Sequence, residues 1–230
     1  MNRKYCRLIM GLVVLMLAGT VFSKELMLAA SKDTFGRSNR RNRNSGASEQ
    51  LLIAHVPNVR TLIAFDLSGI TNEISGVQLQ FRQHNSMPDK IDMVVAPMVN
   101  TSNNAAWSEG QGNLGTQGQN SRPGEACYAF SAFRDVPWES AAGDGLVDLA
   151  DSMLWKSPVA TVNGLGWEKG TWVRVPINDV ALLEKTRKSK TPTITFGVWG
   201  KAGDGLYSIS SNNSDWPAVL LLDLKEDKSK

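Results

Sequence analysis

Three glycines of the stretch EGQGNLGTQG have the Gly-x-Gly-x-x-Gly spacing of loops that bind the phosphates of dinucleotides. They are Gly110, Gly112 and Gly115. This spacing indicates a dinucleotide-binding site only where it lies between a buried strand and the start of a helix. The preceding residues, VNTSNNAAWSEG, are polar, and the following residues, TQGQNSRPGEA, contain Gly118 and Pro123 but no helical period. We therefore interpret the stretch as a long Gly-rich loop.

The residue combinations that define common enzyme classes do not occur in the sequence. It has no His-Glu-x-x-His, paired-cysteine, Gly-x-Ser-x-Gly or Gly-Lys-Ser/Thr motif. The two histidines, His55 and His84, fall in or at the end of expected strands, where we expect structural or solvated roles. Glycoside hydrolysis needs only two carboxylates about 5–10 Å apart, so it stays open as a function. The acids in expected loops are Glu109, Glu125, Glu139 and Asp144.

Tryptophans are the next candidates, because sugar-binding sites use aromatic rings as platforms for the C–H faces of sugars. All seven lie between residues 107 and 216. Trp172 and Trp199 fall in expected strands, and Trp107 lies at the base of the Gly-rich loop, so packing in the core or on a sheet explains them. Three others are flanked by polar or turn residues, and packing that pins a loop is the alternative for each. The candidate ligand-binding platforms are therefore Trp138, Trp155 and Trp216.

Two charged stretches are further candidate binding sites, one for calcium and one for an acidic polysaccharide. ESAAGDGLVDLAD offers hard oxygen ligands of the kind that calcium prefers, in a spacing unlike the EF-hand loop. Its candidate calcium ligands are Asp144, Asp148 and Asp151, and a solvated acidic turn is the alternative. Arg40 and Arg41 belong to an arginine cluster that could pair with a uronic-acid or sulfated polysaccharide. A solvated loop is the alternative for that cluster.

The beginning of the chain predicts export. MNRKYCR is basic, and LIMGLVVLMLAGTVF is apolar but short for a membrane span, so residues 1–23 are expected to be a signal peptide. Cleavage after Ser23 or after Ala30 fits, and an uncleaved anchor is the alternative. The expected location is secreted, periplasmic or cell-surface, with no stable membrane insertion after cleavage.

Composition then restricts the partners. Removing three basic residues with the signal peptide leaves 22 basic against 22 acidic residues, so no overall field favours nucleic acid. Cys6 is lost in the same step, which leaves Cys127 single and, we expect, buried as a small hydrophobe. With 42% apolar residues in 230, the chain can form a substantial core.

From Leu51 onward the apolar period is two. In GVQLQFRQ the apolar Val77, Leu79 and Phe81 alternate with polar side chains, which predicts a strand with one buried face. Further β-rich runs are LLIAH, VRTLIAFDL, KIDMVVAPM, TWVRVPI, TPTITFGVW and PAVLLLDL. INDVALLEKTRKSK is the one good helical candidate, capped by Asn178 or Asp179. Many short strands and one short helix predict an all-β fold, an antiparallel two-sheet β-sandwich of the jelly-roll type.

The order of motifs strengthens this interpretation. DTFGRSNRRNRNSGASEQLLIAHVPNVRTLIAFDLSGI runs from an Asp-Thr strand, through a polar Asn-x-Gly loop, to an Arg-x-Leu-x-x-Phe-Asp strand. Its matching positions are Asp33, Asn44, Gly46, Arg60, Leu62, Phe65 and Asp66. Five further segments follow along the chain, in this order: GVQLQFRQ, WSEGQGN, VPWESAAGDGLVDL, GTWVRVPINDV and DWPAVLLLDL. Over residues 33–224 this order resembles the DNRLRE domain family of exported sandwich domains.

The resemblance implies a fold and a class of ligand. Relatives include carbohydrate-binding modules of polysaccharide-degrading enzymes, some of which recognise acidic algal sugars, and also uncharacterised surface proteins. The resemblance further implies a structural calcium ion. YSISSNN stands where many relatives have an aromatic-Ser-x-Glu segment, so no ligand role is carried over to it.

The sequence as a whole predicts a signal peptide over residues 1–23, a linker over 24–32, a sandwich domain over 33–224 and a polar tail over 225–230. The predicted function is a non-catalytic, monomeric carbohydrate-binding-like module for an extracellular or envelope polysaccharide, which could be acidic. The alternative is a structural or adhesive surface protein with a protein partner. A small polysaccharide-active enzyme is the third possibility.

Overall fold

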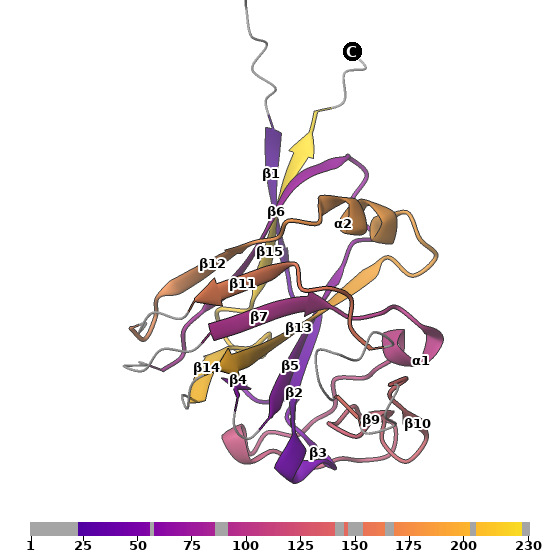
Figure 1. Cartoon of the computed structure of the whole chain (residues 1–230), viewed down its shortest axis with the longest axis vertical. Coiled ribbons are helices and arrows are strands. Elements are labelled where there is room, and N and C mark those ends of the chain that lie inside the picture. Colours follow the sequence, from indigo (N-terminus) through magenta and orange to yellow (C-terminus); the bar gives the residue numbers. More distant parts are fainter. Residues whose placement is uncertain are drawn as a thin grey trace, which may run out of the picture.

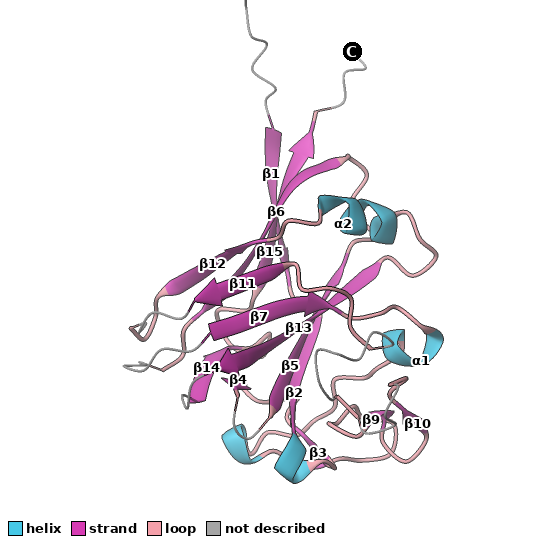
Figure 2. Cartoon of the chain, in the orientation of Figure 1, coloured by secondary structure: helices cyan, strands magenta, loops and turns pink. Residues whose placement is uncertain are grey.

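The computed structural model describes residues 23–55, 58–85, 92–140, 145–146, 154–163, 168–202 and 206–226. Two antiparallel sheets enclose one large apolar cluster and form a β-sandwich, which confirms the predicted all-β class (Figures 1 and 2). In spatial order, sheet A contains β1 (Ser23–Ala29), β15 (Val219–Lys225), β6 (Ile74–Arg82) and β12 (Trp172–Pro176). Sheet B contains β11 (Ala160–Asn163), β7 (Asp92–Pro97), β13 (Thr193–Ala202), β5 (Val59–Asp66) and β2 (Lys32–Arg37).

Three short strand pairs and four helical segments complete the described elements. The pairs are β4 (Gln50–Ala54) with β14 (Leu206–Ser210), β3 (Arg43–Asn44) with β8 (Gln119–Asn120), and β9 (Phe130–Ala132) with β10 (Val136–Pro137). The α-helices are α1 (Ser102–Ala105) and α2 (Val180–Arg187), and the 3₁₀ turns are η1 (Ser38–Arg40) and η2 (Gly115–Gln117). In these ranges no helix is long and apolar enough to cross a bilayer.

Strand β6 follows the predicted alternation. Val77, Leu79 and Phe81 point into the large cluster between the sheets, where they meet Phe196 of β13 and Leu220 of β15. The residues between them in sequence therefore face outward, because successive side chains of a strand lie on opposite faces. Sheet A consequently has one buried face and one outer face.

Sheet B, in contrast, is covered on both faces. Nearly every residue of β5 and β7 is buried, so neither strand shows an exposed side. The outer face of sheet B packs against side chains from the segment between β7 and β11, which includes α1, β9 and β10 at the lower right of Figure 1. This second cluster contains four tryptophans: Trp107, Trp138, Trp155 and Trp199.

The predicted helix is confirmed as α2. The Asp179 side chain caps it by accepting a hydrogen bond from the Leu182 N–H at 3.0 Å, and Leu182 and Leu183 bury its apolar face. Glu184 forms an ion pair with Arg187 at 2.8 Å, and its carboxylate also accepts a hydrogen bond from the Ile74 N–H at 2.6 Å. These interactions lower the pKa of Glu184 to about 2 and attach α2 to the start of β6.

The region expected to be a linker differs from the prediction. Residues 23–29 form strand β1, which pairs with β15 from Ser23↔Lys225 to Ala29↔Val219, and Lys32 begins β2. The physical reason is that Leu26 and Leu28 pack against the core while the other strand positions face outward. The expected polar tail likewise begins inside β15, at Lys225. The expected signal peptide lies outside the described residues, except for Ser23.

Candidate functional site

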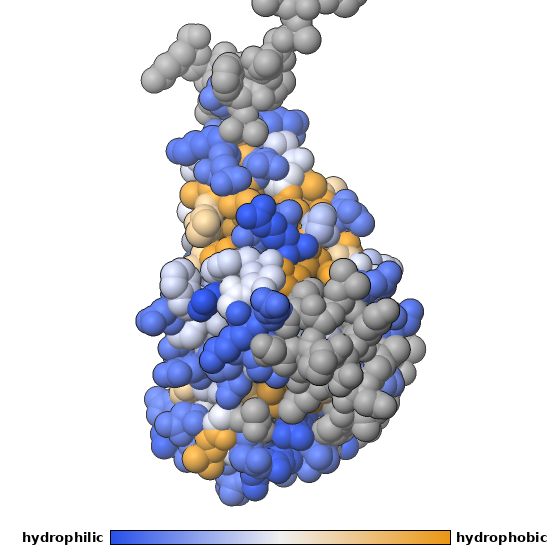
Figure 3. All heavy atoms as spheres, turned by 90° about the vertical axis from the view of Figure 1, so that its left-hand side faces the viewer, coloured by the Kyte–Doolittle hydropathy of each residue, from blue (hydrophilic) through white to orange (hydrophobic). Residues whose placement is uncertain are grey.

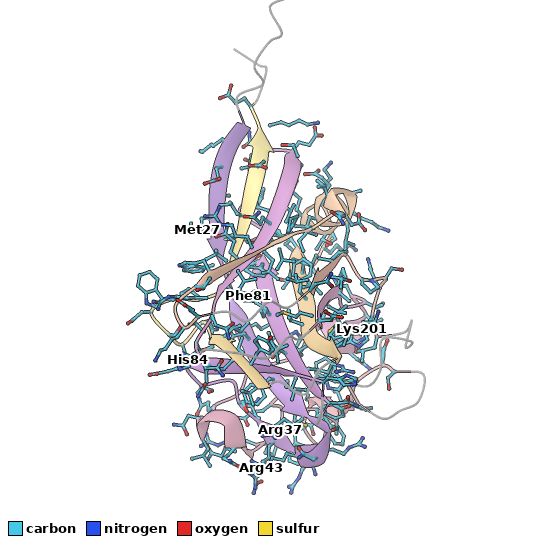
Figure 4. All side chains as sticks on the ribbon, turned by 60° about the vertical axis from the view of Figure 1, so that its left-hand side comes forward. Met27, Arg37, Arg43, Phe81, His84 and Lys201 are labelled. Atoms are coloured by element: carbon cyan, nitrogen blue, oxygen red, sulfur yellow. The ribbon has the colours of Figure 1, made fainter. Side chains whose placement is uncertain are left out.

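The outer face of sheet A carries most of the large apolar side chains that the described structure exposes. Met27 on β1 is 63% exposed, Trp172 on β12 is 37% exposed and Trp216, just before β15, is 50% exposed. Leu114, in the Gly-rich loop, is the fourth such side chain in these ranges. Exposed indoles are uncommon without a partner, because burying an aromatic ring is strongly favourable. This face is therefore the candidate functional site, and Figure 4 shows Met27 at its left edge. Figure 3 shows an apolar area exposed in the upper part of the molecule, above a mainly hydrophilic surface.

The two tryptophans form a corner. Their ring centroids lie 6.4 Å apart and their planes meet at 82°, so the edge of one ring faces the other. The guanidinium group of Arg82 lies 4.9 Å from the centroid of Trp216, in cation–π geometry. Arg82 also donates from Nε to the carbonyl oxygen of Gly170 at 3.2 Å. Arg82 therefore supports Trp216, while half of the indole surface stays accessible to a ligand.

The loop before Trp216 is held by hydrogen bonds to the segment that precedes β4 and by a hydrogen bond within the loop. Ser211 N–H donates to the carbonyl oxygen of Glu49 at 3.1 Å, and the Ser211 hydroxyl donates to the carbonyl oxygen of Ser48. Asn213 Nδ2 donates to the carbonyl oxygen of Gly46 at 2.6 Å. The hydroxyl of Ser214 accepts from the Trp216 N–H at 3.2 Å. The backbone that carries the indole is thus fixed before any ligand binds.

Two neighbouring carboxylates, of which Asp33 is buried and Glu109 is half-buried, lie beneath this loop. Asp33 Oδ2 accepts from the Asn212 N–H at 2.6 Å, and Glu109 Oε1 accepts from the Asp33 N–H at 3.2 Å. Burial raises the pKa of Asp33 well above its usual value, and the charge of Glu109 raises it further. Burial also raises the pKa of Glu109, against the lowering effect of its hydrogen bonds and of Lys32. These acids anchor the loop of Trp216 to β2 and to the Gly-rich loop.

The Gly-rich loop is organised by the side chain of Asn44. Asn44 Nδ2 donates to the carbonyl oxygens of Glu109 and Ala126, both at 2.6 Å, and Oδ1 accepts from the N–H groups of Gly46 and Gly112 at 2.9 and 3.0 Å. A Cβ atom at Gly112 would lie 2.0 Å from the Asn44 carbonyl oxygen, so only glycine fits there. The glycine spacing therefore serves a close backbone approach rather than a phosphate site. The resemblance motif contains Asn44, but sequence reasoning gave it no role.

Two hollows lie on either side of Trp216, each of about 550 Å³, and they share Asp215 and Trp216. The first has a mainly apolar lining that comes from β1, β15 and the tryptophan corner. The second has a mainly polar lining around Arg82, His84 and Lys169. Figure 4 places Met27, from the first hollow, and His84, from the second, along the same side of the molecule. Each hollow is in the size range of small-ligand sites, and together they flank an exposed aromatic ring.

Two of the three tryptophans predicted as platforms are buried, which corrects that prediction. Trp138 and Trp155 are each 2% exposed and belong to the second cluster on the outer face of sheet B. Trp138 Nε1 donates to the carbonyl oxygen of Cys127 at 2.8 Å, and the Trp155 ring lies 5.1 Å from that of Trp199. Both rings therefore pin the covering segment to sheet B. Trp216 is exposed, and the structure joins it to Trp172, to which the sequence gave no binding role.

The charged candidates lie elsewhere. Arg40 donates to the carbonyl oxygen of Gln117 at 2.8 Å, and Arg41 lies 5.9 Å from the ring centroid of Tyr128, so both support loops at the end of the molecule where Figure 4 shows Arg43. The predicted calcium ligands Asp144, Asp148 and Asp151 lie outside the described residues. Within the described ranges, no three His, Cys, Asp or Glu side chains form a metal-binding group.

Among the acids considered for hydrolysis, Glu125 has a structural role. Its carboxylate accepts from the N–H groups of Gln111 and Arg122 at 3.1 and 2.8 Å. It therefore holds two loops together, as Glu109 does. Asp144 lies outside the described residues.

A comparison with protein-family models finds no match for this chain, and a comparison with curated proteins finds none either. The resemblance to the DNRLRE family therefore remains a hypothesis that rests on the order of motifs, and the site is interpreted from its own geometry.

Proposed function

We propose that this protein is a non-catalytic carbohydrate-binding module whose site is the tryptophan corner on sheet A. The observation that carries the proposal is the exposed corner of Trp172 and Trp216 between two hollows of sugar size. An indole face matches the apolar C–H face of a pyranose ring, and the hollows on both sides fit the neighbouring sugars of a chain.

The site also contains groups that pair with hydroxyls. Gln80 and Arg174 lie on the floor of the apolar hollow, and Asp215 lies at the boundary between the hollows. The hydrogen-bonded loop of Trp216 is pre-organised, so binding loses little conformational entropy there. The expected ligand is a polysaccharide of the cell envelope or the extracellular space, in keeping with the export that the N-terminal sequence predicts.

The test is affinity electrophoresis of the purified protein through a panel of neutral and acidic polysaccharides. We expect one class of polysaccharide to retard the protein and Trp216→Ala to abolish the retardation. Leu114→Ala is the matched control, because Leu114 is 59% exposed and lies outside both hollows. If no polysaccharide retards a folded sample, the proposal is wrong and a structural or adhesive role with a protein partner takes its place. Release of reducing ends would instead indicate an enzyme.

A further inference from the structure

The floor of the apolar hollow changes from apolar to hydrogen-bonding side chains across sheet A. This change indicates which kind of ligand fits the hollow. Strand register places four residues in one row across sheet A, from β1 to β12: Ala29, Val219, Gln80 and Arg174. All four line the hollow, so they face outward on the same side. The row is apolar at its β1 end and hydrogen-bonding at its β12 end. Met27 adds a flexible apolar wall beside Ala29, and the tryptophan corner closes the opposite side.

The polar end of the row has both a donor and an acceptor available. Gln80 is 8% exposed, and its Nε2 donates to Gln78 Oε1 at 2.7 Å. Among the described residues the side-chain oxygen of Gln80, Oε1, accepts no hydrogen bond. The side chain of Arg174 is exposed and, in the same part of the chain, its guanidinium group forms no ion pair or hydrogen bond. A carbonyl acceptor and a guanidinium donor therefore lie beside each other at the boundary with the apolar surface.

We propose that this hollow binds the acetamido group of an N-acetylated sugar, an inference that rests on the proposed function. The acetamido N–H would donate to the Gln80 carbonyl oxygen and its C=O would accept from Arg174. Its methyl group would lie against Ala29, Val219 and Met27. The ligand class is a β-linked polysaccharide that contains N-acetylhexosamine, with the neighbouring sugar in the polar hollow beyond Trp216.

Other ligands fit the hollow less completely. A carboxylate sugar would pair with Arg174 but would leave the apolar end in contact with water, and a free amine would be repelled by Arg174. A protein partner needs an interface of about 800 Å² on each side, so it would have to extend well beyond this hollow. A small group with one polar and one apolar end matches the row best.

The test compares three hexasaccharides with the same β-1,4-linked backbone by isothermal titration of the purified full chain. The first carries N-acetyl groups at carbon 2, the second carries free amines and the third carries hydroxyls. We expect the acetylated hexasaccharide to bind about tenfold or more tightly than the other two, from methyl burial and two hydrogen bonds. Met27→Ser should reduce this preference severalfold, and Leu114→Ser, an equally exposed control, should leave it unchanged.

The outcomes separate this inference from the proposed function. If the hydroxyl or amine hexasaccharide binds as tightly as the acetylated one, the acetamido inference is wrong. If another polysaccharide binds in a Trp216-dependent way and none of the three hexasaccharides does, the inference again fails and the function stands. If no glycan of any kind binds, both fail. A preference for the acetylated hexasaccharide that Met27→Ser does not alter also contradicts the inference, because the apolar wall would then have no part in it.

Discussion

Replacing Asn44 with alanine tests whether one side chain organises the loops under the site. The Asn44 amide makes four hydrogen bonds of 2.6–3.0 Å and is fully buried, so Asn44→Ala leaves two N–H groups and two carbonyl oxygens without partners. At about 1 kcal/mol for each net hydrogen bond, less where water reaches the partly buried groups, we expect a loss of about 2–4 kcal/mol. In a domain of this size the loss corresponds to about 6–12 °C in Tm.

The assay is equilibrium unfolding in urea, followed by tryptophan fluorescence, with Asn42→Ala as the control. Asn42 lies on the same segment but is exposed, so its loss should change the free energy of unfolding by less than about 0.5 kcal/mol. The variant Asn44→Asp tests the same hydrogen bonds through the pH dependence of stability. It keeps the acceptor for Gly46 and Gly112 but turns a carboxylate oxygen toward two carbonyls, so it should be destabilised at pH 7 and partly recover as the carboxylate is protonated. Equal stability of Asn44→Ala and Asn42→Ala would refute the reasoning.

Three further predictions concern burial. Because the folded-state pKa of Asp33 is raised, the wild-type protein loses stability as pH rises from about 4 toward that pKa, and Asp33→Asn should remove this loss. Urea unfolding between pH 4 and 8 should therefore show the variant gaining stability relative to wild type by at most about 1.4 kcal/mol per pH unit. Trp155→Ala should cost about 3–5 kcal/mol in the same assay, whereas Trp172→Ala should cost about 1 kcal/mol or less; similar costs would contradict the assignment of core and surface. The Cys127 thiol, whose pKa burial raises, should react with a chromogenic disulfide about 100-fold more slowly in native protein than in urea, and rapid native labelling would show that it is accessible.

The alternation of apolar and polar residues predicts strands well where only one face of the strand is buried. The alternation in β6 identified both its core side and its outer side, and the cap at Asp179 identified the start of α2. Strand β1 was missed because its outward Met27 is as apolar as its inward Leu26 and Leu28, so no alternation shows. A stretch of this kind beside an expected signal peptide does not look like a strand.

The tryptophans show why the site was harder to predict. Polar neighbours in sequence suggested that Trp138 and Trp155 are exposed, but burial depends on what covers sheet B. Continuous apolar runs such as VRTLIAFD and DMVVAP are typical of strands buried on both faces, and they were the available signal that sheet B is covered. That signal would have directed attention to Trp172 on the open sheet. The contact between Trp172 and Trp216 joins positions 44 residues apart and needed the structure.

The pairing of the first and last strands has a mechanical consequence. Ser23 on β1 is opposite Lys225 on β15, so both ends of the described chain leave the sandwich at the same end, as Figure 1 shows. A force that pulls these two ends apart acts along the hydrogen bonds between the strands, which are perpendicular to the strands, and loads them one pair at a time. The two strands would therefore separate like a zipper at low force, and Met27 and Ala29 would be drawn away from the tryptophan corner. Tension between the two ends would therefore open the proposed ligand site before the rest of the sandwich unfolds.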